Sequence, residues 1–140
     1  MKKFIVRGNS NYDYDIYETE NSKNPIDLEK ISPVHACTIR CVALINYFVD
    51  YNKKQCDFYK KEEGQVVTAL MNLFDKNSKI KADDILNYFG VQYNGEIEWG
   101  AIHGLTEDVC NDLNHSSNLY NAAYIYFKQQ HEMDTDNLIK

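Results

Sequence analysis

The longest hydrophobic pattern in the chain runs from Ser32 to Asn52 and reads SPVHACTIRCVALINYFVDYN. Its apolar residues recur at spacings of three and four and also cover most of the remaining circumference, which is typical of a helix buried on nearly every side. Ser32 can cap this helix, and Pro33 suits the first helical position because no backbone donor is needed there. Polar residues interrupt the segment and charges flank it, so the pattern predicts a core helix and not a membrane span.

Arg40 is the exception on this helix, because it is the only charged residue between His35 and Asp50. A buried guanidinium would need a carboxylate or carbonyl partner, whereas an exposed one would mark the hydrated edge of the helix. The pattern alone leaves both alternatives open.

Alternation of apolar and polar residues near the start of the chain predicts a β-hairpin. Its strands are expected over Lys3–Arg7 and Tyr12–Glu18, with turn residues from Gly8 to Asn11 between them. One face of the second strand should pack on the central helix. The side chains divide between this inner face (Tyr12, Tyr14 and Ile16) and an outer face (Asp13, Asp15 and Tyr17).

The remainder of the chain predicts further helices and one more strand. Helical spacing is found over Glu63–Asp75, Ala82–Phe89 and Thr106–Leu113. Alternation of apolar and acidic residues predicts a strand over Glu96–Trp99. The segment Leu119–His131 suits a strand by residue type and a helix by length, and a possible Ser117 cap with two following alanines favours the helix.

These elements predict an α+β fold. A small antiparallel sheet, built from the N-terminal hairpin and the later Glu96–Trp99 strand, is expected to pack on several helices around the central buried helix. The chain of 140 residues is long enough to bury a core. We therefore expect a single globular domain spanning residues 1–140.

The net charge of the chain favours some classes of binding partner over others. A formal net charge of −6 argues against a general nucleic-acid binder, which would need a basic face. It favours a larger protein with a basic surface, such as a nucleic-acid-binding protein, and no direct contact with nucleic acid or membrane is expected. Four irregularly spaced cysteines without a secretory signal predict free thiols and a cytoplasmic location.

Cys37 is the candidate for nucleophilic chemistry, because free N–H groups and the helix dipole stabilise a thiolate near a helix N-terminus. The segment HACTIRCVALIN resembles the nucleophile helix of papain-like cysteine peptidases and cell-wall amidases. This resemblance implies a cysteine hydrolase with Cys37 as its nucleophile. The Gly-His-hydrophobic strand of that superfamily is missing, and the best base and orienting carboxylate in this chain are His131 and Asp134. Alternatively, Cys37 and Cys41 simply fill a buried helix.

No metal and no cofactor is expected. Cys37 and Cys41 lack the tight CxxC pairing of structural zinc sites. The segment from Phe74 to Leu86 departs from a calcium-binding EF-hand loop, since a leucine occupies the place of the bidentate glutamate. The glycines have no phosphate-loop spacing.

The acidic hairpin is the predicted partner-binding surface. Its carboxylates flank a tyrosine, a combination that attracts arginine and lysine and offers a rigid aromatic anchor; the alternative is a solvated strand face. The predicted binding residues are Asp13, Asp15, Tyr17, Glu18 and Glu20. Since no catalytic constellation is complete, we expect a binding or inhibitor protein that occupies a basic site on a larger partner. Phage anti-defence proteins such as anti-CRISPR inhibitors, and bacterial immunity proteins, share this profile.

Overall fold

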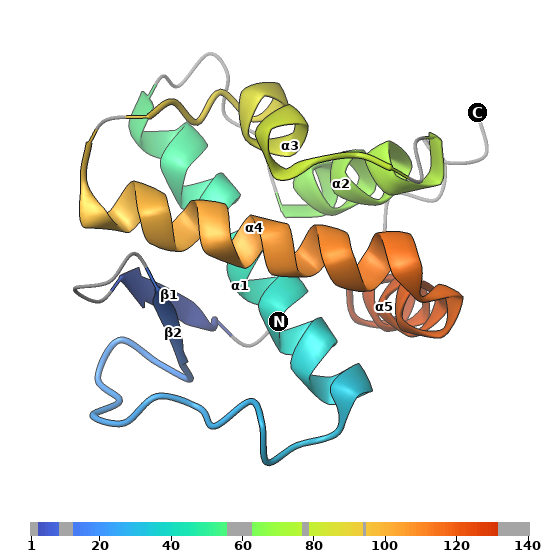
Figure 1. Ribbon diagram of the computed structural model, residues 1–140, viewed down its shortest axis with the longest axis horizontal. Coiled ribbons are helices and arrows are strands. Elements are labelled where there is room, and N and C mark those ends of the chain that lie inside the picture. Colours follow the sequence, from blue (N-terminus) through green and yellow to red (C-terminus); the bar gives the residue numbers. More distant parts are fainter. Residues whose placement is uncertain (1–2, 9–12, 56–62, 77–78, 94, 132–140) are drawn as a thin grey trace.

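Two short strands and a set of helices follow one another along the chain. The computed structural model describes residues 3–8, 13–55, 63–76, 79–93 and 95–131, and gives only the backbone at residues 55, 130 and 131. The elements are β1 (Ile5–Gly8), β2 (Tyr14–Tyr17), α1 (Pro33–Gln55), α2 (Glu63–Lys76), α3 (Ala82–Tyr88), α4 (Ile97–His115) and α5 (Ser117–His131). In Figure 1, α4 crosses α1, with the hairpin on one side of the crossing and α2 and α3 on the other. The structure confirms the predicted α+β fold, in which a small antiparallel sheet packs on helices.

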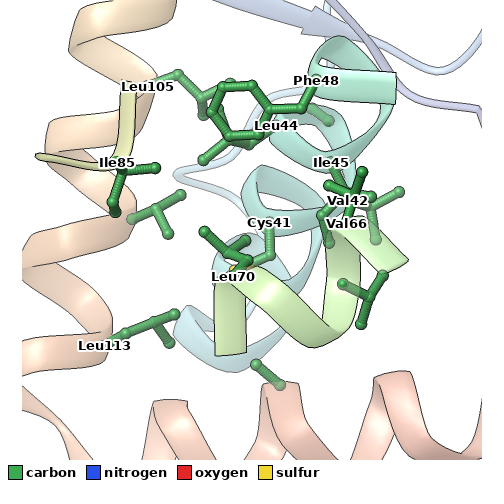
Figure 2. Packing of buried hydrophobic residues seen from close by; sticks show 14 of the residues in the cluster. Cys41, Val42, Leu44, Ile45, Phe48, Val66, Leu70, Ile85, Leu105 and Leu113 are labelled. Carbon is green, nitrogen blue, oxygen red and sulfur yellow. The ribbon is translucent and has the colours of Figure 1, made fainter. Parts of the chain in front are cut away.

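The central helix α1 begins as predicted. The Ser32 hydroxyl accepts a hydrogen bond from the backbone N–H of His35 at 3.1 Å, which caps the first turn. Every residue from Cys41 to Ile45 is at most 1% exposed. Figure 2 shows side chains of α1 meeting apolar side chains of α2, α3 and α4 in one cluster. Burial of a large apolar side chain contributes about 1.5–3 kcal/mol, so this helix supplies much of the driving force for folding.

The hairpin packs one face against the helices. β1 and β2 pair antiparallel, with Val6 opposite Ile16 and Arg7 opposite Asp15. Ile16 is 1% exposed, and Tyr14 lies on the same face of the strand and is half-buried. The predicted inner face is therefore confirmed for these two residues. Gly8, predicted as a turn residue, is instead the last residue of β1. The rest of the predicted turn, together with Tyr12, lies outside the described residues.

The predicted strand at Glu96–Trp99 is wrong. Glu96 is the residue before α4, and Ile97 to Trp99 form the first turn of that helix. The short alternation misleads because the apolar residues that follow continue at helical spacing without a break. These buried residues are Ala101, Ile102, Leu105, Val109 and Leu113. The longer helical pattern outweighs four alternating residues, and the sheet consists of β1 and β2 in the described part of the chain.

The predicted helix over Leu119–His131 is confirmed as α5, but its cap is the preceding serine. The backbone N–H of Leu119 donates to the hydroxyl of Ser116 at 3.2 Å, and Tyr120 donates to the Ser116 carbonyl at 3.0 Å. Ser117 is instead the first residue of the helix. None of the described helices combines the length and the apolar composition that a membrane span requires.

Gly8 sets how closely β1 approaches α4. A Cβ atom at this position would lie 2.8 Å from Ile97 Cγ2 and 3.0 Å from the Ile97 carbonyl oxygen. Gly8→Ala should lower the free energy of unfolding by about 1–3 kcal/mol, because a backbone oxygen cannot move aside as a side chain can. Urea unfolding measures this loss. Gly64→Ala on α2 is the matched control: beyond the backbone of its own helix, no described atom lies within 4 Å of the added Cβ, so stability should stay equal or rise. Equal stabilities for the two variants would contradict the close packing.

Candidate functional site

A hydrogen-bonded network joins the hairpin to α1 and α4. Arg40 lies on α1, and its Nε donates to the hydroxyl oxygen of Tyr14 from β2 at 3.0 Å. The Tyr14 hydroxyl donates in turn to the carboxylate of Asp108 on α4. One turn further along α4, Asp112 Oδ2 lies 3.7 Å from Arg40 Nη1. Four side chains from three elements thus meet at one place.

The network is partly removed from water. The side chains of Arg40 and Asp112 are 23% and 21% exposed. Burial and the bond to Asp108 raise the pKa of Tyr14 well above its ordinary value, against the opposite influence of Arg40. Burial also raises the pKa of Asp112, partly offset by Arg40. The guanidinium therefore has the carboxylate partner that a buried charge requires.

Cys37 lies beneath this network. It is 1% exposed, and its thiol donates a hydrogen bond to the Asp112 carboxylate, which helps to hold the pKa of Asp112 down. A hydrogen bond to Cys37, together with burial, raises the pKa of Cys41 well above its ordinary value. The described contacts of Cys37 are those of a core residue. The side chain of His131 and the whole of Asp134 lie outside the described residues, so the hydrolase hypothesis stays a prediction.

An acidic depression opens beside the network. It has a volume of about 510 Å³ and lies between β2, the loop before α1, and the middle of α1 and α4. Tyr14 and Arg40 both contribute to its lining. Its remaining charged residues are all acidic: Asp13, Asp15, Asp27, Glu29 and Asp108. Five carboxylates and one guanidinium therefore face a shared volume of solvent.

The predicted binding residues of the hairpin lie on different parts of the protein surface. Asp13 and Asp15 line the acidic depression. The guanidinium of Arg7 lies 4.8 Å from the centre of the Tyr17 ring, and Arg7 also donates to the Glu20 carbonyl at 2.9 Å. Glu18 and Glu20 are exposed and line a different hollow near Lys3 and Ile5. The structure therefore brings together two of the five predicted residues.

Sequence reasoning missed the other acids of the depression. Asp27 and Glu29 belong to the connection between β2 and α1, whose sequence gave no sign of facing the hairpin. Asp108 and Asp112, spaced by four residues, did carry a signal, because this spacing puts two carboxylates on one helix face. That signal could have been matched to the need of Arg40 for a partner.

Among the residues that the structure describes, no group of three or more histidine, cysteine or acidic side chains could hold a metal ion. Comparison of the chain with family models, with curated proteins and with solved structures gave no match. The site must therefore be interpreted from its own geometry and charge.

Tyr14→Phe tests the network. The variant should lower the free energy of unfolding at neutral pH by about 1–2 kcal/mol, because Arg40 and Asp108 lose a shared partner. Urea unfolding measures the loss. Tyr17→Phe should cost less, because the Tyr17 hydroxyl forms no hydrogen bond with the described residues.

The pH dependence of the same variant gives a second test. A raised pKa means that folded Tyr14 keeps its proton where the unfolded chain releases it, so stability falls as the pH rises above about 10. Tyr14→Phe should make this fall less steep. An unchanged slope together with unchanged stability would contradict the network.

Proposed function

We propose that this protein is a binding protein that occupies a basic site on a larger protein partner. The acidic depression is the observation that carries the proposal. Carboxylates from three separate parts of the fold line it, namely the hairpin, the loop before α1 and α4. Clustered carboxylates attract arginine and lysine side chains and steer a basic partner during association.

The arrangement leaves most of this negative charge available. Arg40 is the one basic residue among the described residues of the lining, and it is already engaged with Tyr14 and Asp112. Asp13, Asp27, Glu29 and Asp108 are all exposed, so their charges reach the solvent. A guanidinium from a partner can donate two parallel N–H bonds to the two oxygens of such a carboxylate. Arginine is therefore the favoured group on the partner.

We propose further that the protein is an inhibitor that acts in the cytoplasm. A small acidic domain can compete with nucleic acid for the basic site of a nucleic-acid-binding protein, as phage anti-defence proteins do. The net charge of −6 and the concentration of carboxylates in one depression support this form. Binding of this kind needs no catalytic group, cofactor or metal.

Single charge-neutralising variants test the proposal with a labelled nona-arginine peptide as the probe and fluorescence anisotropy as the measurement. Asp15→Asn and Glu29→Gln should each weaken binding by about two- to fivefold, since an exposed charge pair contributes up to about 1 kcal/mol. Added salt should reduce the difference from the wild type, because it screens exposed charges.

Asp75→Asn is the matched control, because it removes one exposed charge at the far end of α2 and lies outside the depression. An equal loss of affinity in this control would show that net charge alone binds the peptide, which would contradict the proposed site. In pull-downs from the native host, the variant Asp13→Asn/Asp15→Asn/Glu29→Gln should lose a protein that the wild type and Asp75→Asn retain. Equal capture by all three proteins would also count against it.

A further inference from the structure

A second cavity lies on a different part of the molecule. It has a volume of about 340 Å³ and lies between β1, the C-terminal half of α1 and the first turn of α4. No residue of its lining belongs to the acidic depression. The aromatic residues that line it are Phe4, Tyr47, Tyr51 and Trp99, and we call it the aromatic pocket.

The aromatic walls of this pocket are held in place by ring contacts. Tyr47 and Tyr51 are one turn apart on α1 and stack with their ring centres 5.8 Å apart and their planes 28° apart. Trp99 stacks on His103 at 4.9 Å and meets Tyr93 edge-on at the same separation. Rings positioned in this way need little reordering to receive a ligand, which favours binding.

Carboxylates lie beside these rings. Asp50, half-buried on α1, and Glu98, on the first turn of α4, line the pocket together with Glu20. Burial, followed by the charge of Glu98, raises the pKa of Tyr47 well above its ordinary value. Lys3 and Lys54 also line the pocket but are exposed side chains, whose ammonium groups extend readily into water.

The indole Nε1–H of Trp99 is buried away from solvent. The pocket therefore meets a ligand with aromatic faces and neighbouring carboxylates, and these define the chemistry of the ligand.

We propose that the aromatic pocket binds an organic cation, either a guanidinium or an alkylammonium group. Aromatic faces attract such cations through the ring quadrupole, and the carboxylates add charge attraction. The volume suits one arginine-sized group and falls within the range of small-ligand pockets. The cation is either a side chain of a protein partner or a free small molecule. The site uses its own residues and does not depend on the acidic depression.

Trp99 is the only tryptophan in the chain, so its fluorescence reports directly on the pocket. Nα-acetyl-arginine amide and n-propylguanidine are titrated as the peptide-borne and the free form of one monovalent cation, with the neutral isostere Nα-acetyl-citrulline amide as a control. The indole N–H signal in NMR spectra gives a second readout. The two cations should produce saturable changes and the citrulline compound none. Tighter binding of the acetylated amide indicates a partner side chain, and tighter binding of propylguanidine indicates a free small molecule.

Substitutions of pocket residues test whether the cations bind in the aromatic pocket. Glu98→Gln and Asp50→Asn should each weaken the cations by about three- to tenfold, and Tyr51→Leu should weaken them at least as much. Glu29→Gln, in the acidic depression, should leave the affinity unchanged. Circular dichroism establishes that each variant is folded, and the conservative Glu98→Gln keeps the test valid if Tyr51→Leu does not fold.

Two results would overturn the proposal. One is the absence of a saturable change with either cation in both readouts. The other is loss of affinity in Glu29→Gln with none in Glu98→Gln, because the cations would then bind at the acidic depression.

Discussion

The near-complete burial of α1 is the constraint on which the rest of the structure depends. Because apolar residues cover most of its circumference, other elements must cover it from several directions, and the hairpin, α2, α4 and α5 all pack against it. Arg40 is the exception in this apolar surface. A half-buried guanidinium needs polar partners, and Tyr14, Asp108 and Asp112 supply them. The acidic depression lies where this polar interruption reaches the solvent.

The elements whose pattern is long were predictable from the sequence. The central helix and the helix over Leu119–His131 followed from spacing and capping residues, because burial of a whole face leaves a periodic signal. The Glu96–Trp99 strand was mistaken since four residues are too few to separate an alternating pattern from the start of a helix. The Ser116 cap was missed by one position, since two adjacent serines carry the same chemistry.

The candidate site was predictable only in part, for a different physical reason. A strand pattern tells which residues share a face, so Asp13 and Asp15 could be assigned to one surface. It does not tell which loop or helix lies beside that surface, so Asp27, Glu29 and Asp108 remained unconnected to it. The strand pattern also does not predict that the Arg7 guanidinium packs on the Tyr17 ring. Contacts between distant segments arise from tertiary packing, and local periodicity carries no information about such contacts.

The two binding regions differ in how they would hold a cation. The acidic depression is open and rich in carboxylates, which favours fast, salt-sensitive encounter with a basic protein surface. The aromatic pocket is smaller and offers ring faces beside carboxylates, which favours a single cationic group. They share no lining residue, so each can be disabled without the other.

The most direct test of the central claim is to map the contact surface by NMR. Amide signals of the ¹⁵N-labelled protein are followed during titration with the nona-arginine peptide at physiological ionic strength. Binding at the acidic depression predicts that the largest shifts cluster in residues 13–16 and 27–29 and around Arg40 and Asp108. Shifts spread evenly over exposed acids, or confined to α2 and α5, would contradict the claim that this depression recognises a basic partner.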